Sequence, residues 1–256
     1  MLPENRLQTV KEFIQSRGEV TTSELQRFYA DYSAMTLWRD LKLLEDQGCI
    51  RRIHGGAISM LAATPQVEGI YSKRAREHIH EKNVIARAAI PYISTGHAVY
   101  LDAGSTTMNV ANLMGQERFT VITSGANIAI ELSQRHTCDV LLTGGQISEN
   151  TLSCSGETAE AFVRSINIDL AIMSSSGYSL ASGFTIGSHS ESMLKRCVIE
   201  RASRVIMLMD SSKFNRSLPF TFASFSDIET LITDSVLSDD IALAARDAGV
   251  QIVIAE

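Results

Sequence analysis

The chain has 256 residues, of which 45% are hydrophobic and 20% charged, and its net charge is −6 at pH 7. This composition excludes a disordered chain and leaves room for a small domain beside a larger one. The 4 cysteines stand far apart without a CxxC pair, which argues against a zinc site or a disulfide framework. No apolar run approaches the roughly 18 residues of a membrane span, and charges interrupt the N-terminal helix where a signal peptide would be apolar. We therefore expect a cytoplasmic protein without a metal, a cofactor or a membrane partner.

Residues 22–48 have the pattern of a helix-turn-helix. A first helix is expected over 22–29, and a second begins where Ser33 or Thr36 can cap its unpaired amides. Gly48 suits the left-handed residue that ends many helices. Inward-facing positions recur at helical spacing in both segments: they are Leu25, Phe28, Leu37, Leu41 and Leu44.

A basic strand at residues 50–53 and the turn at 54–56 are typical of the β-wing of a winged helix. A winged helix-turn-helix over residues 1–59 predicts a DNA-binding domain. The alternative is a small packed bundle that does not bind DNA. Net charge does not decide between them, since basic and acidic residues are equal in number over residues 1–57.

Local positive charge remains on the second helix and on the strand that follows it. The residues expected to contact DNA are Ser33, Met35, Thr36, Trp38, Arg39, Lys42, Arg51, Arg52 and His54.

These residues resemble the N-terminal domain of the DeoR family of bacterial transcription regulators. There the recognition helix typically reads Thr-Ile-Arg-Arg-Asp-Leu and is followed by Leu-Glu, a Gly, a basic wing and His-Gly-Gly-Ala. The matching residues here are Thr36 to Leu41, Leu44-Glu45, Gly48, Arg51-Arg52 and His54 to Ala57. Trp38 replaces the first arginine of the pair, and an indole can neither pair bidentately with guanine nor clamp a phosphate. Packing of Trp38 on the DNA backbone, on a thymine methyl group or over the domain's own core all fit the sequence.

A linker is expected over residues 60–80, because Pro65 disfavours helix in the residue before it and small or polar residues surround it. The basic stretch 71–82 is interpreted as a solvated linker helix, with contact to DNA phosphates as the alternative.

From residue 81 to 256, helical segments alternate with short apolar strands. Strands are expected at 98–101, 119–122, 140–142, 170–173, 204–209, 230–232 and 251–254. Helices are expected at 81–94, 108–114, 126–134, 157–164, 191–201 and 240–248. This alternation predicts an α/β domain whose mostly parallel sheet is covered on both faces.

In such a sheet, ligands bind beyond the carboxyl ends of the strands. Residues 102–107 lie at such an end, where Gly104 allows close approach and the amides of the next three residues begin a helix. These are the ingredients of a phosphate cradle, although Ser and Thr also serve as plain helix caps. Residues 123–125 and 143–145 repeat the pattern, and Lys195 either supplies a countercharge or lies on a solvated helix face.

This larger segment resembles the DeoR-type C-terminal domain, a sugar-phosphate sensor whose fold is related to ribose-5-phosphate isomerase. The matching motifs are Leu101 to Thr107, Thr143 to Gly145, Gly156, Lys195-Arg196 and Asp210 to Phe214. The resemblance implies that Gly104 to Thr107 hold the phosphate, that Lys195 contacts the effector and that Asp210 to Lys213 form another wall. The effector-binding candidates are then Asp102, Gly104, Ser105, Thr106, Thr107, Thr123, Ser124, Lys195 and Lys213.

Three segments depart from the family pattern, so the identity of the sugar stays open. Residues 174–179 read Ser-Ser-Ser-Gly-Tyr-Ser where the family has Gly-Ala-Asp-Gly-Ile-Asp. Residues 123–125 replace Thr-Asn-Ser, and residues 183–186 replace Gly-Leu-Thr-Thr.

The function expected from both halves is that of a repressor of a sugar-utilisation operon, which a phosphorylated sugar releases from DNA. An activator of transcription is the alternative. One winged helix reads a short half-site of double-stranded DNA, so at least two copies are expected on one scaffold. The resemblance to the DeoR family implies a dimer or a tetramer. An isomerase-like enzyme would need a carboxylate base near the substrate. Residues 174–179 offer none, and Asp102 and Glu191 are tied to no second acid by spacing. An adaptor without a ligand is a third possibility.

Overall fold

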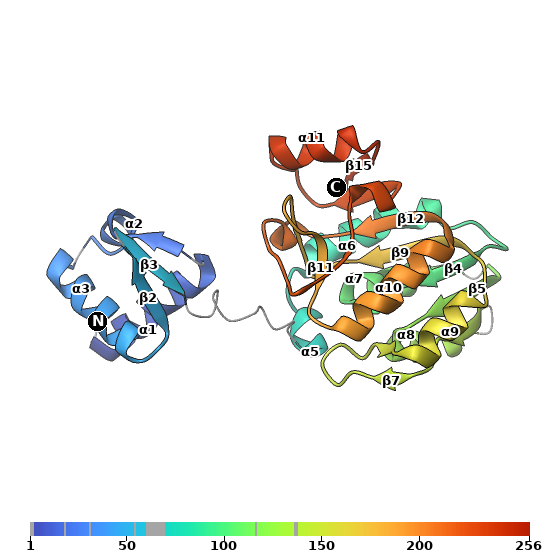
Figure 1. The fold of residues 1–256 in the computed structure, drawn as a ribbon, viewed down its shortest axis with the longest axis horizontal. Coiled ribbons are helices and arrows are strands. Elements are labelled where there is room, and N and C mark those ends of the chain that lie inside the picture. The colour runs from blue at the N-terminus through green and yellow to red at the C-terminus, as the bar shows by residue number, and fades with distance from the viewer. Residues whose placement is uncertain are drawn as a thin grey trace. The chain divides into compact units, whose positions relative to one another are not determined.

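The computed structural model describes residues 3–17, 19–30, 32–53, 55–59, 70–115, 117–135 and 138–256. The chain divides into two compact units, residues 1–67 and 68–256 (Figure 1). Residues 60–69 of the linker expected over 60–80 lie outside the described residues, as does His54.

The first unit is a winged helix-turn-helix, as the sequence predicts. Its helices are α1 (Pro3–Arg17), α2 (Thr22–Phe28) and α3 (Ala34–Asp46). An antiparallel sheet of order β1-β3-β2 completes it, formed by β1 (Glu19–Thr21), β2 (Ile50–Ile53) and β3 (Gly56–Ser59). Strands β1 and β3 were not expected from the sequence, because Val20 is the one strongly apolar residue of the first and a glycine begins the second.

Local caps set the ends of these helices. The side chain of Thr21 accepts a hydrogen bond from the Glu24 amide and forms a capping box at the start of α2. Ser33 caps α3, its hydroxyl accepting from the Thr36 amide at 3.2 Å. Gly48 has a φ of +69°, the left-handed conformation predicted for it after α3.

A single apolar cluster forms the core of this unit. Its buried members are Val10, Ile14, Val20, Leu25, Leu37, Leu41, Leu44, Ile50 and Ala57. The prediction that Phe28 faces inward is wrong: its side chain is 56% exposed and packs against Phe13, with ring centroids 4.7 Å apart. Asp40 is buried on α3 and accepts two hydrogen bonds from Arg6, at 2.6 and 3.0 Å.

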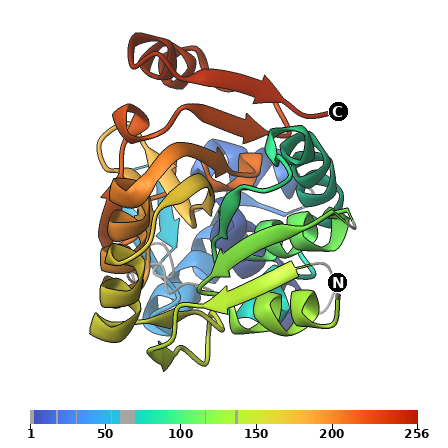
Figure 2. The ribbon, with the colours of Figure 1, turned by 90° about the vertical axis from the view of Figure 1, so that its right-hand side faces the viewer.

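The second unit contains a seven-stranded sheet of order β15-β14-β12-β9-β4-β5-β6, in which every neighbouring pair is parallel (Figure 2). The α/β fold with a parallel sheet is thus confirmed. The strands are β4 (Ala98–Leu101), β5 (Phe119–Thr123), β6 (Cys138–Leu142), β9 (Ile168–Ser174), β12 (Ala202–Leu208), β14 (Thr230–Thr233) and β15 (Gln251–Ile254).

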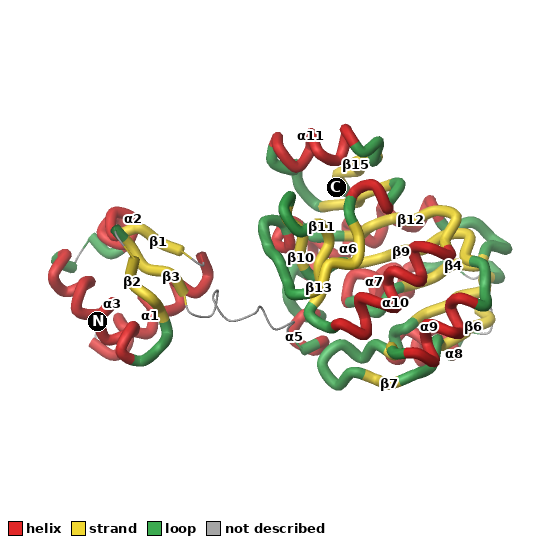
Figure 3. Tube along the Cα trace, viewed as in Figure 1, coloured by secondary structure: helices red, strands yellow, loops and turns green. Residues whose placement is uncertain are grey.

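Two apolar clusters cover the two faces of this sheet. One contains residues of α6 (Ile79–Ala89), α7 (Ser105–Leu113) and α8 (Ala126–Ser133). The other contains residues of α9 (Glu157–Arg164), α10 (His189–Arg201) and α11 (Asp239–Asp247). Successive strand residues alternate between them: Val99 and Leu101 belong to the first cluster, Tyr100 to the second. Figure 3 shows α9 and α10 crossing the sheet.

Small β elements complete the second unit and were not predicted. An antiparallel sheet of order β10-β11-β13 joins Gly177–Ser179, Gly183–Ile186 and Phe220–Ala223. A ribbon pairs β7 (Gln146–Ile147) with β8 (Cys154–Ser155). Three 3-10 turns are described: η1 (Ile90–Tyr92), η2 (Ser211–Lys213) and η3 (Phe225–Asp227).

Two helix predictions need correction. The interpretation of residues 71–82 as one solvated helix is wrong: α5 covers only Tyr71–Arg74, a turn follows, and Lys82 is buried on α6. The helix expected over 108–114 begins earlier, at Ser105. No helix among the described residues is long and apolar enough to cross a membrane, and these residues hold no cluster of side chains suited to a metal ion.

Candidate functional site

The outward face of α3 carries exposed polar and apolar side chains. Arg39 and Lys42 are exposed and make no hydrogen bond or ion pair with the described part of the chain. Met35 and Trp38 are exposed on the same helix. The hydroxyls of Ser33 and Thr36 lie 2.9 Å apart at the helix start. The expected DNA-contacting residues of α3 therefore run from its start to Lys42, and Met35, Trp38, Arg39 and Lys42 are exposed.

The two wing arginines differ in their surroundings. Arg51 is exposed and has no partner among the residues the structure describes. Arg52 is held by Glu45: its Nε donates to Oε2 at 2.6 Å and its amide to Oε1 at 2.9 Å. Its guanidinium also lies over the Trp38 ring, 5.0 Å from the centroid. These bonds, first from the Arg52 amide and then from its side chain, lower the pKa of Glu45.

The carboxyl ends of neighbouring strands bring the sensor candidates together. Asp102 follows β4 and is buried; its Oδ2 accepts from the Ser174 amide at 2.9 Å and from the Ser174 hydroxyl at 2.7 Å. Lys195 on α10 donates to the same oxygen and to the Ser174 carbonyl, the latter at 3.0 Å. The Lys195 ammonium also lies 5.1 Å from the Phe222 ring centroid. Lys195 is thus a buried ion-pair partner, which corrects the alternative of a solvated helix face.

The start of α7 lies directly beside this ion pair. A Cβ on Gly104 would stand 2.6 Å from the Ser174 hydroxyl, so a side chain would crowd this contact. No side chain caps the first amides of α7. Thr107 is occupied, since its hydroxyl donates to the Asp102 carbonyl at 2.6 Å. Ser105 and Thr106 are buried, and their hydroxyls have no partner in the described part of the chain.

The next strand end supplies two further hydroxyls that already have partners. Thr123 Oγ1 accepts from the Gly125 amide at 2.9 Å, and Ser124 Oγ accepts from the Tyr100 hydroxyl at 2.9 Å. Burial, followed by the neighbouring Asp102 carboxylate, raises the pKa of Tyr100 well above its ordinary value. These residues therefore fix the loop that borders the Asp102 site. A neighbouring strand end offers a hydroxyl without a partner among the described residues, that of buried Thr143.

Lys213 belongs to a second group of cations, at the end of β12. Burial lowers the pKa of Lys213, nearby Asp210 raises it, and Arg216 and Arg74 lower it further. Burial likewise lowers the pKa of Lys82, and Asp210 opposes that shift. Lys82 donates to the carbonyl oxygens of Arg74 and Glu77, the latter at 2.7 Å. Sequence reasoning missed Lys82 because its partners are backbone oxygens, which no residue pattern reveals.

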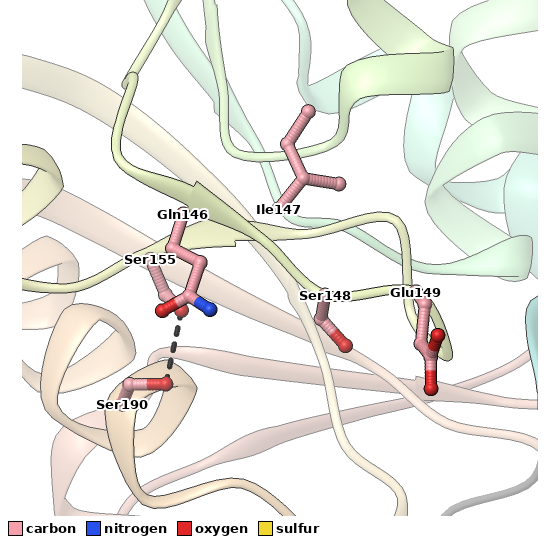
Figure 4. Close-up of a pocket in the computed structure, with 6 residues that line it drawn as sticks. All are labelled: Gln146, Ile147, Ser148, Glu149, Ser155 and Ser190. Carbon is pink, nitrogen blue, oxygen red and sulfur yellow. Dashed lines mark hydrogen bonds between the residues drawn. The ribbon is translucent and has the colours of Figure 1, made fainter.

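Glu191 is a further buried acid near this edge. Its Oε1 accepts from the Thr151 hydroxyl, and its charge contributes to the raised pKa of Tyr100. An open hollow of about 440 Å³ lies beside the first turn of α10, with five polar residues and one apolar one around it (Figure 4). They are Gln146, Ile147, Ser148, Glu149, Ser155 and Ser190. Ser155 donates to Ser190 at 3.0 Å, and Ile147 points away from Gln146 on the opposite side of β7. Apart from its serines, no residue pattern indicates this hollow.

A winged helix-turn-helix joined to an α/β unit with polar groups at the carboxyl edge of its sheet defines a DNA-binding regulator with a sensor domain. Residues 6–62 match the DeoR-like helix-turn-helix domain and residues 77–235 match the DeoR C terminal sensor domain. The chain belongs to the DeoR family of transcriptional regulators.

Sequence similarity to known regulators extends over the whole chain. The HTH-type transcriptional regulator GlpR of Haloferax volcanii is 33% identical over 99% of this chain and 98% of its own length. The HTH-type transcriptional repressor GlcR of Bacillus subtilis is 31% identical over 100% of this chain and 98% of its own length. Both relatives are named for transcriptional control and not for an enzymatic activity. Ribose 5 phosphate isomerase A from Neisseria gonorrhoeae superposes with a TM-score of 0.39 and 13% identity over 53% of each chain, too weakly to bear on function.

Proposed function

We propose that this protein represses a sugar-utilisation operon in the cytoplasm and releases its operator when a phosphorylated sugar binds at the carboxyl edge of the large sheet. One observation carries the effector half of this proposal. The start of α7 offers buried amides that no side chain caps, next to the Asp102–Lys195 ion pair.

A phosphate suits this helix start on physical grounds. The first amides of a helix lack internal partners and lie at the positive end of its dipole. Phosphate oxygens accept several charge-assisted hydrogen bonds at once. Ser105 is 9% exposed and Thr106 is 6% exposed, so these bonds would form largely shielded from water. The partnerless hydroxyls of both residues would donate to the same anion.

Lys195 has a different role from a free countercharge. Its ammonium is already neutralised by Asp102, and the two together hold Ser174. We propose that this pair shapes the sugar end of the site. The positive charge that attracts the effector would come from the start of α7 and from Lys213, with Lys82 as a further cation near Lys213. Thr123 and Ser124 fix the bordering loop.

The DNA half of the proposal uses the exposed face of α3 and the wing. Arg39 and Lys42 would contact bases and phosphates, and Arg51 would contact the phosphate backbone. The second unit would assemble two or four copies, so that two winged helices engage two half-sites of double-stranded DNA. An effector changes operator affinity only by its differential affinity for the bound and released arrangements.

Isothermal titration of the full-length protein tests the cradle. Pentose and hexose monophosphates are compared with their unphosphorylated sugars and with inorganic phosphate. Ser105→Asp places a carboxylate where the phosphate is proposed to lie, and Ser105→Asn is its neutral control of equal size. We expect at least one monophosphate to bind far more tightly than its sugar. We also expect Ser105→Asp to abolish that binding while Ser105→Asn retains part of it.

Retained operator binding by both variants shows that they are folded. Equal affinity for a monophosphate and its sugar would show that the start of α7 does not bind phosphate. Equal losses in Ser105→Asp and Ser105→Asn would show that the charge at this position is irrelevant.

A further inference from the structure

An apolar patch interrupts the polar face of α3. Ala34, Met35 and Trp38 line an open hollow of about 350 Å³. Met35 is 61% exposed and Trp38 is 48% exposed. The core beneath is complete without them, since Leu37, Leu41 and Leu44 are the buried residues of this helix stripe. This patch (Ala34, Met35 and Trp38) therefore does not serve to pack the domain.

The tryptophan of this patch is held in place. The Arg52 guanidinium lies 5.0 Å from the Trp38 ring centroid, an attractive cation–π contact. Arg52 is itself fixed by two hydrogen bonds to Glu45. A ring supported on one face loses little side-chain freedom when another group packs on its exposed part. Trp38 is thus preorganised for an apolar contact.

Two cations lie beside the apolar patch on α3. Arg39 follows Trp38 directly and Lys42 lies one turn after it, both exposed and without an acidic partner in the described part of the chain. Such a border favours a polyanion as the occupant. The patch also lies at the N-terminal end of the second helix of a helix-turn-helix, where residues reach base edges in the major groove.

Among the groups that the major groove presents, the thymine 5-methyl group is the apolar one. We propose that Met35 and Trp38 read thymine methyl groups, so that each operator half-site carries thymine at the positions that face these two side chains. The inference concerns sequence preference and depends on DNA binding through α3, not on the identity of the effector. Trp38 stands where the family pattern has an arginine, so this chain prefers thymine where an arginine would favour guanine.

Deoxyuridine substitution tests this reading with the intact protein. The preferred operator is selected from random duplexes, and each thymine of a half-site is then replaced by deoxyuridine, which removes only the methyl group. We expect one or two positions at which affinity falls about fourfold, the effect of losing one buried methyl group. In Trp38→Ala or Met35→Ala, the sensitivity at the corresponding position disappears.

Leu43→Ala is the matched control, because Leu43 is 49% exposed on the same helix but does not line the patch. It should keep the full deoxyuridine sensitivity. The proposal is overturned if no thymine-to-deoxyuridine change alters affinity. It is also overturned if Trp38→Ala and Met35→Ala keep the wild-type sensitivity, or if they alter only the oligomeric state, which would make the patch a contact between copies.

Discussion

The outward face of α3 and the carboxyl edge of the large sheet both carry cationic side chains, but these cations have opposite surroundings. Arg39 and Lys42 on α3 are exposed and have no ion-pair partner within the described residues. Lys195 at the sheet edge is buried and paired with Asp102. Substitutions on α3 should therefore change binding alone, whereas substitutions at the sheet edge should change stability as well.

The largest expected effect comes from Lys195→Met, which leaves the buried Asp102 carboxylate without its ion-pair partner. Breaking a buried pair costs about 3–5 kcal/mol of unfolding free energy. Urea unfolding followed by circular dichroism measures it, and adding Asp102→Asn should recover part of the loss. The control is Arg204→Ala, which breaks an exposed pair with Glu229 at 2.8 Å and should cost at most about 1 kcal/mol. Similar losses in both variants would remove the contrast between buried and exposed cations.

Arg39→Ala should weaken operator binding by about 1–3 kcal/mol, the range for a good base contact. The unfolding free energy should stay unchanged, since the side chain is exposed. Gel-shift titration beside a urea melt reports both quantities. Wild-type operator affinity in this variant would contradict the assignment of α3 as the recognition helix.

The wing arginines Arg51 and Arg52 also differ in whether an acidic partner already holds them. Arg51→Ala should weaken binding to all sequences and reduce the salt slope of binding by about one. Arg52→Ala should change the slope less, because its guanidinium is already paired with Glu45. Binding measured over a salt series distinguishes the two variants. An equal change of slope would show that the Arg52–Glu45 ion pair breaks when DNA binds.

A small pH effect follows from the same pair. Arg52 lowers the folded-state pKa of Glu45 from its ordinary value of 4.5. The charged form therefore stabilises the fold above that value, and the stabilisation is lost as the pH falls through the lowered pKa. Thermal melts over an acid series should show this loss in wild type and in the exposed control Asp46→Asn. Glu45→Gln should lack it, and an unchanged acid dependence in Glu45→Gln would contradict the pairing.

The sequence predicted the elements whose signals are local. Ser33, the leucine stripe and Gly48 set the limits of α3 through caps and spacing that lie within one segment. The apolar strand runs predicted the parallel sheet because buried strands need continuous apolar residues. The inward-facing prediction for Phe28 was wrong, because its contact with Phe13 joins two different helices and leaves no signal within one segment. The pairing of β11 with β13 was missed because its partners lie more than thirty residues apart, a separation that gives no periodic signal.

The contacts that join the sensor candidates could not be predicted from the sequence. Lys195 and Asp102 are 93 residues apart, and no spacing rule joins them. Under our proposal, their pairing makes Lys195 a support of the site and not a free countercharge. Likewise, the Thr107 hydroxyl is taken by the Asp102 carbonyl and is not offered to a ligand. Topology predicts which residues share an edge, whereas the three-dimensional contacts determine which of them are free to bind.

Release of labelled operator DNA from the full-length protein tests the central claim most directly. Pentose and hexose monophosphates are titrated beside their unphosphorylated sugars, and bound DNA is followed by fluorescence anisotropy. The account predicts that at least one monophosphate releases the operator at concentrations where its sugar has no effect, and that Ser105→Asn responds more weakly than wild type. Equal release by both members of every pair, or tighter operator binding in the presence of the monophosphate, would contradict it.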